Sequence, residues 1–569
     1  MEELSNNKSL LGQSWKLQPQ DPGLNIIQNI LKNRSLTEPA QLNAYLNPNL
    51  KKGFHNPFLM KGMDRAVERL NRAIKDQERI IIFGDYDVDG ISGTAILYNA
   101  LKLCGANLSY RLPHRINDGY GLNIKFFEEF KEKEVKLLLT VDCGISCHEQ
   151  VDQAAEFGID VIITDHHTIP AQIPEKAYAI LHPKQTDCPY PFKGLTGAGV
   201  AYKLASALIT DRFAGPARDR ILFSLLDLVS LGTVADLGPL LDENRIIVKY
   251  GLEAMQNSSW PGLNLLMESA GIDLSQKLGV SDIGFKIGPR INAAGRIDHP
   301  YHALQMLLHE GDLEEGKFKA SRLERLNQER QQMVQIALAE AEQRFADYPS
   351  DRKIFIAWSP DWHAGILGLI CSKIVEKYGL PTIVLQEFEE HLVASFRSNK
   401  TLNAVDSLNH VSEYLEHFGG HAQAAGFSLK KSNLEPFIEK ISAYAAEVLE
   451  HHHFEQELLI DAILDRHDIN DNFMRLLGQM EPFGVGNEKP VFLVRNIQPK
   501  DLKTVGREKQ HLHFQADTGM SHFSSIAFKM GTYFSAIEGS EKLDLALHLE
   551  RNVWNGRETI QFQVLDFMK

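Results

Sequence analysis

Four short apolar runs alternate with helix-forming stretches between about residues 80 and 190, and they constrain the fold more than any other feature. The runs are "RIIIFGD", "KLLLTVDCG", "GIDVIITDHH" and "AYAILHP". Their hydrophobicity is continuous rather than alternating, which is typical of parallel strands covered by helices on both faces. The sequence therefore predicts a doubly wound α/β domain with a parallel sheet.

Three of these runs end in side chains that can bind metals. Asp85, Asp142 and the segment from Asp165 to His167 each follow an apolar run directly. In open parallel sheets, ligands bind beyond the carboxyl ends of the strands, where loops from neighbouring strands converge. We therefore expect the three motifs to meet at one place, although they lie far apart in the sequence.

The first motif, "GDYDVDG", places Asp85, Asp87 and Asp89 on alternate positions. Carboxylates this close repel one another unless a cation lies among their oxygens. The spacing matches the start of a calcium-binding EF-hand loop, which needs a bidentate Glu at its twelfth position. That position is Ile96, and an apolar strand precedes the motif, so a calcium loop is excluded. A metal site and a solvated acidic turn remain as alternatives.

The composition sets the broad class of protein. A length of 569 residues indicates about three or four domains. Five scattered cysteines argue against a disulfide framework. We find no apolar stretch suited to a signal peptide or a membrane helix, so we expect a cytoplasmic protein. The formal charge of −14 argues against a purely electrostatic nucleic-acid binder, so such a partner would need local basic patches and metal.

The rest of the chain divides into further predicted parts. A mostly helical region holds "LFSLLDLVSLGTVADLGPL" and a Gly- and Arg-containing loop, "IGPRINAAGRI". The stretch from Gly316 to Pro349, without internal proline or glycine, predicts a long linker helix. A second α/β unit runs from "KIFIAW" to "FGGHAQAAGF". After a predicted solvated linker, "HHH" at 451–453, about five alternating runs fit an OB-fold β-barrel.

The predicted domain boundaries follow from these patterns. They are an N-terminal extension at 1–50, the parallel-sheet domain at 51–310, the linker helix at 311–350, the smaller α/β domain at 351–450 and the OB-fold domain at 455–569. The extension carries no pattern that assigns it a fold.

The candidate metal ligands are carboxylates with one or two imidazoles and no required thiolate. They are Asp85, Asp87, Asp89, Asp142, Asp165, His166, His167, Asp227 and Asp236. Such a set suits Mn²⁺ or Mg²⁺ better than structural zinc, and its size suits two ions. Two ions about 4 Å apart lower the pKa of a bound water and stabilise both oxygens of a displacement at phosphorus. The pattern therefore predicts metal-dependent hydrolysis.

The motifs also resemble a known family. "DYDVDG", "VDCGIS", "TDHH" and "DLVSLGTVAD" resemble the four motifs of the DHH phosphoesterase superfamily in order and context, and "GGHAQAAG" resembles its DHHA1 partner domain. With the terminal β-module, nearly everything after about residue 50 resembles the bacterial RecJ family of single-stranded-DNA-specific exonucleases.

The resemblance implies roles for particular residues. The implied metal ligands are Asp85, Asp87, Asp142, His166 and Asp227. His167 would lie near the scissile phosphate and complete the catalytic set. Asp89, Asp165 and Asp236 would orient ligands or loops.

Seven residues are candidates for binding the substrate: Arg115, Arg290, Arg296, Ser395, Arg397, Ser398 and His421. Loops flanked by Gly or Ser let the backbone approach a phosphate that an Arg can grip with two bonds. The ordinary role of a lone surface Arg is a solvated charge. Loop context and the resemblance favour phosphate binding, more strongly for Arg397 and Arg290 than for Arg115 and Arg296.

The terminal module offers a second candidate surface. Its basic residues are Lys500, Lys503, Arg507 and Lys509. With His513 and Phe514 on neighbouring strands, they predict a track for phosphates and stacked bases. A barrel with a purely structural role is the alternative.

These features predict a nuclease that threads single-stranded DNA between the two α/β domains and cleaves it one phosphodiester bond at a time with two Mn²⁺ or Mg²⁺ ions. The resemblance implies an exonuclease that degrades the strand to mononucleotides in the 5′-to-3′ direction. The resemblance implies a monomer that acts in recombinational and mismatch repair and contacts the single-stranded-DNA-binding protein and a RecQ-type helicase. The alternatives are an oligoribonuclease or pyrophosphatase of the superfamily, which lack the terminal barrel, and a catalytically inactive DNA-binding scaffold. Intact carboxylates at every motif argue against the scaffold.

Overall fold

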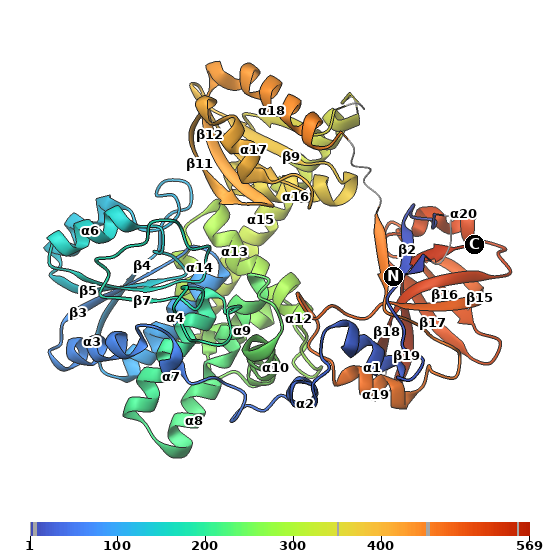
Figure 1. The fold of residues 1–569 in the computed structure, drawn as a ribbon, viewed down its shortest axis with the longest axis horizontal. Helices are drawn as coiled ribbons and strands as arrows, with labels where there is room; N and C mark the ends of the chain where they lie inside the picture. Colours follow the sequence, from blue (N-terminus) through green and yellow to red (C-terminus); the bar gives the residue numbers. More distant parts are fainter. Residues whose placement is uncertain (1, 4–7, 347, 350–351, 451–455, 555–556) are drawn as a thin grey trace. The chain divides into compact units, whose positions relative to one another are not determined.

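The computed structural model describes residues 2–3, 8–346, 348–349, 352–450, 456–554 and 557–569, so the predicted linker at 451–453 lies outside the described residues. The chain divides into two compact units (Figure 1). The smaller unit consists of Met1–Gly53, Pro239–Ile246 and Phe454–Lys569, and the larger of Phe54–Gly238 and Ile247–His453. Among the described residues, no helix combines the length and the apolar character needed to span a membrane.

The larger unit begins with a parallel sheet in the order β4-β3-β5-β6-β7. Its strands are β3 (Arg79–Gly84), β4 (Asn107–Arg111), β5 (Val135–Val141), β6 (Asp160–Thr164) and β7 (Ala179–Leu181). The four predicted runs form β3, β5, β6 and β7, so the predicted doubly wound α/β domain is confirmed. The sequence analysis missed β4 because this edge strand is only partly buried and lacks a continuous apolar run.

Helices cover both faces of this sheet and extend beyond it. They are α3 (Met63–Lys75), α4 (Val88–Leu103), α5 (Phe127–Glu132), α6 (His148–Glu156), α7 (Gly197–Arg212), α8 (Gly215–Ser224), α9 (Leu226–Ala235), α10 (Asp242–Gln256), α11 (Pro261–Ser269), α12 (Val280–Asp282), α13 (Gly288–Ile297) and α14 (Tyr301–Leu307). The almost fully buried α4 packs against α7 and α9. Gly93 lets α4 pack closely on both β5 and α7, since a Cβ there would lie 2.6 Å from Val141 Cγ1 and 3.3 Å from Ala198 Cα.

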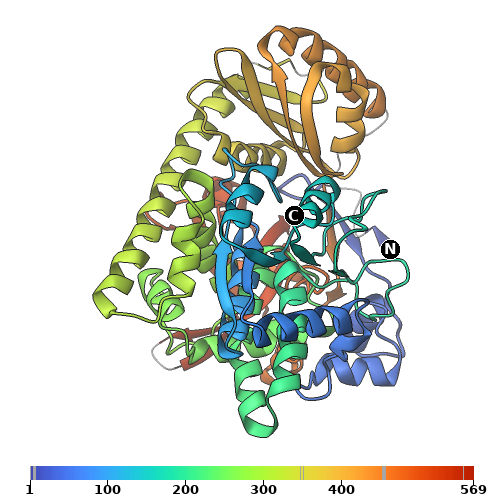
Figure 2. The same ribbon diagram turned by 90° about the vertical axis from the view of Figure 1, so that its left-hand side faces the viewer.

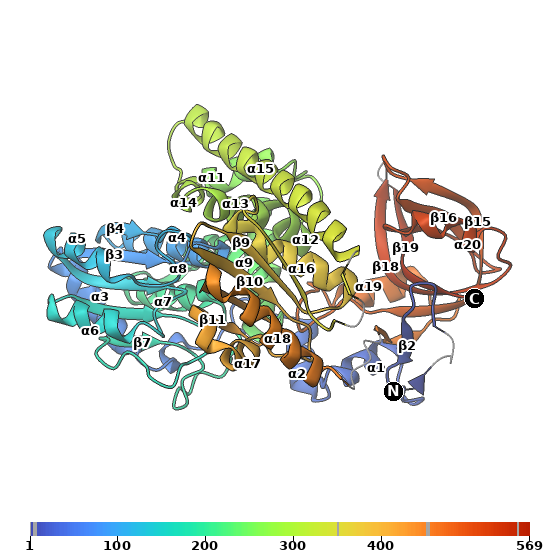
Figure 3. The same cartoon turned by 90° about the horizontal axis from the view of Figure 1, so that it is seen from above.

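The predicted linker helix is α15 (Leu313–Ala346), a single helix of 34 residues. It lies along α11, α13 and α14 (Figures 2 and 3). The segment "IGPRINAAGRI" forms the end of a π-helical turn and α13, so its prediction as a loop was wrong. Pro289 stands in the first turn of α13, where a helix tolerates proline.

The second α/β region has a five-stranded sheet in the order β11-β12-β10-β9-β8, in which only β8 and β9 pair in parallel. Its elements are β8 (Phe355–Ser359), α16 (Leu367–Tyr378), β9 (Thr382–Glu387), β10 (His391–Arg397), α17 (Ala404–His410), β11 (Leu415–His421), β12 (Ala424–Lys430) and α18 (Leu434–Val448). Apolar residues of α17 and α18 pack on one face, and those of α16 on the other. The Gly-rich "FGGHAQAAGF" forms the β11–β12 hairpin.

The smaller unit contains the predicted all-β module. Its sheet has the order β14-β15-β16-β17-β19-β18, and pairing of β15 with β18 closes it into a ring. Its elements are β14 (Ala462–Ile463), α19 (Asp471–Gly478), β15 (Phe492–Val505), β16 (His511–Asp517), β17 (His522–Ala527), α20 (Phe534–Ile537), β18 (Leu543–Trp554) and β19 (Arg557–Met568). The five alternating runs form β15 to β19, so the prediction of an all-β module is confirmed.

The N-terminal residues share the core of this module. Their elements are β1 (Glu2–Glu3), β2 (Ser14–Leu17), α1 (Ile26–Asn33) and α2 (Pro39–Leu46), and β2 pairs in parallel with β13 (Glu457–Ile460). The buried Trp15 ring donates a hydrogen bond to Asp566 Oδ2 at 3.0 Å. The buried Arg245 guanidinium donates to the carbonyls of Tyr45 and Met480. The predicted extension is therefore structurally part of the β-module unit.

Candidate active site

The ends of β3, β5 and β6 bring the predicted motifs together, as the parallel sheet requires. Asp142 follows β5 in the left-handed region, with φ of 61°, which is an unfavourable conformation for a residue with a side chain. Its backbone N–H donates to Thr164 O at 2.9 Å and so remains in the sheet. A Cβ on Gly197 would lie 2.5 Å from Asp142 Oδ1, so only glycine fits there. The fold thus holds the Asp142 side chain in one place.

The side chains after these strand ends form one acidic cluster. His166 Nε2 lies 3.0 Å from Asp142 Oδ1, 3.6 Å from Asp236 Oδ2 and 3.7 Å from Asp89 Oδ2. Three groups have ligand atoms within 4.8 Å of one another: Asp142, His166 and His167; Asp89, His166 and Asp236; and Asp85, Asp87 and Asp142. Asp142 belongs to two of these groups and His166 to two, so the groups are contiguous.

The buried atoms of this cluster fit divalent cations. Among the described residues, Asp85 Oδ1, Asp142 Oδ1 and His166 Nε2 are buried and make no hydrogen bond. The last two lie 3.0 Å apart, so they face one another, and buried polar atoms in this state are costly unless another group satisfies them. Burial, followed by neighbouring carboxylates, raises the pKa of Asp85 and of Asp142 well above the usual value. Burial and the charge of His167 lower the pKa of His166 to about 3, so its imidazole is neutral and offers the lone pair that a metal requires.

Two further aspartates hold these residues in place. Asp89 accepts hydrogen bonds from Gly197 N at 2.6 Å and Ala198 N at 3.0 Å, at the start of α7. Asp165 accepts from Ile145 N at 2.9 Å and lies 2.8 Å from His167 Nδ1. Burial disfavours a charged His167, but the hydrogen bond and charge of Asp165 raise its pKa to about 9. The His167 ring is therefore an imidazolium at neutral pH.

The structure does not bring Asp227 to the cluster, contrary to the sequence prediction. Its carboxylate accepts hydrogen bonds from Ser258 Oγ at 2.6 Å and Trp260 Nε1 at 3.0 Å. Asp236, expected only to orient other groups, is the member of "DLVSLGTVAD" that reaches the cluster. The two positions are nine residues apart, about two and a half turns at 3.6 residues per turn. Asp227, in the first turn of α9, and Asp236, directly after its last residue, therefore lie on opposite sides of the helix axis. This spacing was a signal that the sequence analysis missed.

Three of the four predicted arginines converge beside the Asp85 and Asp87 side of the cluster. Arg115 stacks over the Tyr86 ring with its Cζ 4.3 Å from the centroid. Burial, and after it the charges of Arg115, Arg330 and Arg397, lower the pKa of Arg296 to about 9. Four guanidinium groups within mutual influence favour an anion among them.

Arg290 is not part of this arginine group. Its Nε donates to Glu324 Oε2 at 2.6 Å, and its Nη1 donates to Lys286 O. The charge of Arg290 is thus already balanced within the protein. The prediction of a phosphate-binding loop failed because the segment is helical, and a helix turns Arg290 and Arg296 to different sides.

The remaining predicted substrate ligands have different surroundings. Ser395 and Arg397 share a face of β10, and Arg397 Nη1 donates to Ser395 Oγ at 3.2 Å. Ser398 Oγ donates to Leu402 O at 2.6 Å, so its hydroxyl proton is used within its own loop. The His421 ring, on β11, stacks with that of His167 at a centroid distance of 6.3 Å.

Sequence reasoning missed three side chains at the site. Arg330 on α15 has a buried Nε that makes no hydrogen bond to any residue that the structure describes. The Tyr120 hydroxyl donates to Asp142 O at 3.2 Å and lies 3.1 Å from His167 Nδ1. Lys184, after β7, donates to the His166 carbonyl. Only Tyr120 had a local signal, because it follows Arg115 in a glycine-flanked segment; tertiary packing places the other two.

The predicted track on the β-module is only partly supported. Phe514 is fully buried in the core of the module, so the prediction that it stacks on bases was wrong. Lys500 pairs with Asp517 at 2.5 Å, and His513 Nε2 lies 3.2 Å from Ser524 Oγ. Three other basic residues of the predicted track are exposed: Lys503, Arg507 and Lys509.

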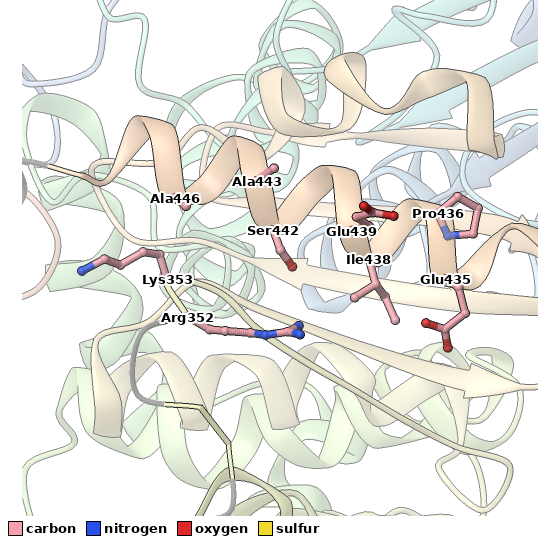
Figure 4. Close-up of a pocket in the computed structure, with 9 residues that line it drawn as sticks. All are labelled: Arg352, Lys353, Glu435, Pro436, Ile438, Glu439, Ser442, Ala443 and Ala446. Carbon is pink, nitrogen blue, oxygen red and sulfur yellow. The ribbon is translucent and has the colours of Figure 1, made fainter.

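A surface pocket on the second α/β region lies apart from this site. Arg352 and Lys353 line one side, and Glu435 and Glu439 of α18 line the other (Figure 4). Its lining includes none of the predicted site residues. Opposite charges face each other across it, which does not favour a polyanion.

Three family descriptions match the chain: the DHH family, N-terminal domain at residues 79–233, the DHHA1 domain at 351–447 and the RecJ OB domain at 460–566. The single-stranded-DNA-specific exonuclease RecJ of Bacillus subtilis is 35% identical over 90% of this chain, which spans 64% of that relative's length. The protein of the same name from Salmonella typhimurium is 33% identical over 95% of this chain and 99% of its own.

Solved structures agree with these matches. The crystal structure of RecJ in complex with Mn²⁺ from Thermus thermophilus superposes with a TM-score of 0.82 at 29% identity, covering 98% of this chain and 79% of that one. The likeness therefore extends over both units of the chain.

Proposed function

The chain belongs to the RecJ family of single-stranded-DNA-specific exonucleases, and we propose that it removes mononucleotides from the 5′ end of single-stranded DNA with two Mn²⁺ or Mg²⁺ ions. One observation carries this proposal. Within the described part of the chain, Asp85 Oδ1, Asp142 Oδ1 and His166 Nε2 are buried and make no hydrogen bond, in a cluster that borders a group of arginines. Such a site holds cations next to a place for phosphate.

The proposed metal ligands are Asp85, Asp87, Asp142, His166 and Asp236, which replaces Asp227 in the expected set. When bound, the ions would lower the pKa of a water and stabilise charge on the departing oxygen. Asp142 lies between two ligand groups and so suits a bridging role. Asp89 and Asp165 keep the ligands oriented.

The other side chains act on the DNA itself. His167, an imidazolium, can donate a hydrogen bond to an oxygen of the scissile phosphate. Arg397, with Arg115 and Arg296 beside it, would hold the terminal 5′-phosphate and so set the direction of degradation. Ser395 positions Arg397 through its hydroxyl oxygen.

The experiment that tests this function compares end-labelled single-stranded and duplex DNA with purified protein and Mn²⁺, before and after addition of EDTA. We expect mononucleotide release from the single strand only, stopped by EDTA. Cleavage of only very short RNA or of pyrophosphate would favour the other phosphoesterases of the superfamily. DNA binding without cleavage in any divalent metal would favour the inactive scaffold.

Broader roles rest on the resemblance alone. We propose that the protein acts in recombinational and mismatch repair as a cytoplasmic monomer, together with the single-stranded-DNA-binding protein and a RecQ-type helicase. We also propose the predicted domain boundaries, except that the N-terminal extension belongs to the β-module unit. The three family matches lie within these boundaries or at their edges.

The metal-free protein is expected to lose stability as the pH rises from 6.5 to 8. Burial, then the charge of a neighbouring aspartate, raises the pKa of Asp89 to about 7 and that of Asp236 to about 8. Both groups ionise near 3.8 in an unfolded chain, so the folded state binds more protons in this window and stability falls with rising pH. His166 opposes this trend only below its ordinary pKa of 6.5.

Thermal unfolding followed in EDTA across this pH window measures the effect. Added Mn²⁺ should flatten the dependence, because cations replace protons among the carboxylates. An equal slope with and without Mn²⁺ would show that the acidic cluster is not the source of the pH dependence.

A further inference from the structure

Charges along the carboxyl edge of the first sheet follow the order of its strands. From one edge to the other, β4 is followed by Arg115, β3 by Asp85, β5 by Asp142, β6 by His166 and β7 by Lys184. The acidic centre thus has a cation on each side. Four strand spacings of 4.7–4.9 Å separate the edge strands by about 19 Å, enough for several phosphates of one strand.

The fold fixes Lys184 on the β7 side of the acidic cluster. Its Nζ donates to the carbonyl of His166. Its backbone N–H donates to His182 Nδ1 at 3.1 Å, and His182 Nε2 lies 2.9 Å from the carbonyl of His167. The loop after β7 is therefore held against the "DHH" segment by three contacts.

The ammonium of Lys184 retains donors for a ligand. It can donate three hydrogen bonds and uses one of them on His166. Among the described residues it makes no ion pair, and the residue is exposed. Although partial burial lowers its pKa, the charges of Asp236 and Asp165 act in the opposite direction, which places Lys184 beside the Asp236 side of the cluster.

His421 belongs to the same border. Burial lowers its pKa, and the charges of His167 and Lys184 lower it further. Arg115 and Arg296, by contrast, interact with the charges of Asp85 and Asp87. The cluster is therefore bordered by arginines on one side and by Lys184, His167 and His421 on the other.

We propose that Lys184 binds the internucleotide phosphate immediately 3′ to the scissile one. This inference rests on the proposed function and deepens it. With the 5′-phosphate among the arginines and the scissile phosphate at the acidic cluster, the next phosphate lies beyond the cluster, on the β7 side. A lysine is a point charge, which suits the single negative charge of an internucleotide phosphate, whereas the fork of an arginine suits the additional oxygen of a terminal phosphate.

The test uses full-length protein and two 5′-phosphorylated substrates, a dinucleotide and a trinucleotide. Only the trinucleotide has a phosphate beyond the scissile one. In Lys184→Met, KM for the trinucleotide should rise about three- to tenfold, less than for a buried charge-assisted bond, because Lys184 is exposed and solvent screens its charge. KM and kcat for the dinucleotide should not change. Lys184→Arg should keep KM for the trinucleotide close to the wild-type value, since arginine retains the positive charge.

Two further measurements distinguish a phosphate contact from support of the His166 loop. The slope of log affinity for a long oligonucleotide against log salt, measured by anisotropy in EDTA, should fall by about 0.7 in Lys184→Met. A neutral methylphosphonate at the linkage 3′ to the scissile one should weaken DNA binding by the wild-type protein. It should leave DNA binding by Lys184→Met unchanged. Lys176→Met is the matched control, because Lys176 precedes β7 and pairs with Asp152 at 3.3 Å.

An equal loss of kcat on both substrates, with an unchanged salt slope, would make Lys184 a support of the His166 loop and overturn the inference. A wild-type KM for the trinucleotide and a wild-type salt slope in Lys184→Met would overturn the inference as well. In both cases wild type would still degrade DNA, and the proposed function would stand. Failure of wild type to degrade any single strand would instead overturn the proposed function.

Discussion

Replacing Asp142 with alanine is expected to lower the turnover of single-stranded DNA by about a thousandfold or more. The carboxylate lies between two ligand groups, so its loss should remove several kcal/mol of metal-dependent stabilisation of the transition state. Each 1.4 kcal/mol lost slows the reaction about tenfold. The variant should still fold, because removal of one buried carboxylate relieves repulsion from Asp85, Asp87 and Asp89. Single-turnover cleavage in Mn²⁺ and in Mg²⁺, with thermal unfolding of the metal-free protein, measures both effects.

Asp187→Ala is the matched control for this variant. Asp187 is exposed, pairs with Lys61 at 2.6 Å and belongs to none of the three ligand groups, so turnover should remain at the wild-type rate. If Asp142→Ala kept more than a small fraction of wild-type turnover, the bridging role would be wrong.

Replacing Arg397 with alanine is expected to abolish the preference for a 5′-phosphorylated end. A terminal phosphate carries more charge than an internal one and has an additional oxygen for the guanidinium. Loss of a charge-assisted bond of about 1.5 to 3 kcal/mol should slow cleavage of 5′-phosphorylated DNA by roughly ten- to a hundredfold. Cleavage rates of strands with a 5′-phosphate or a 5′-hydroxyl, compared for wild type and variant, measure the preference.

Arg352→Ala serves as the control, because Arg352 is exposed in the same region and stacks near Tyr348. It should retain the wild-type preference. A full preference in Arg397→Ala would shift the role of terminal-phosphate reader to Arg296 or Arg115, which lie in the same group of charges.

The acidic centre was predictable because it depends on sheet topology. Continuous apolar runs identify parallel strands, and parallel strands deliver Asp85, Asp142 and His166 to the same edge. The choice between Asp227 and Asp236 depended on helical period, which the sequence contained. Likewise, the alternation of "HLHFQAD" places Phe514 on the same face as the buried Leu512, so the burial of Phe514 could have been predicted from the sequence.

Other features could not be read from local pattern. Arg330 reaches the arginine group only because α15 packs along α13. The helical spacing of Ile27, Ile30 and Leu31 was present within the first fifty residues, but it does not say where this segment packs. That place is set by contacts with residues hundreds of positions away, such as that between Trp15 and Asp566. The position of Lys184 beside the acidic cluster follows only from the strand order, which puts β7 beside β6.

Titration of the metal-free protein with Mn²⁺ by calorimetry tests the central claim most directly. Wild type is predicted to bind two ions per chain, and Asp236→Asn fewer than two. Asp227→Asn should still bind two, because its carboxylate is engaged by Ser258 and Trp260. Binding of no Mn²⁺ by wild type, or loss of an ion in Asp227→Asn but not in Asp236→Asn, would contradict the account.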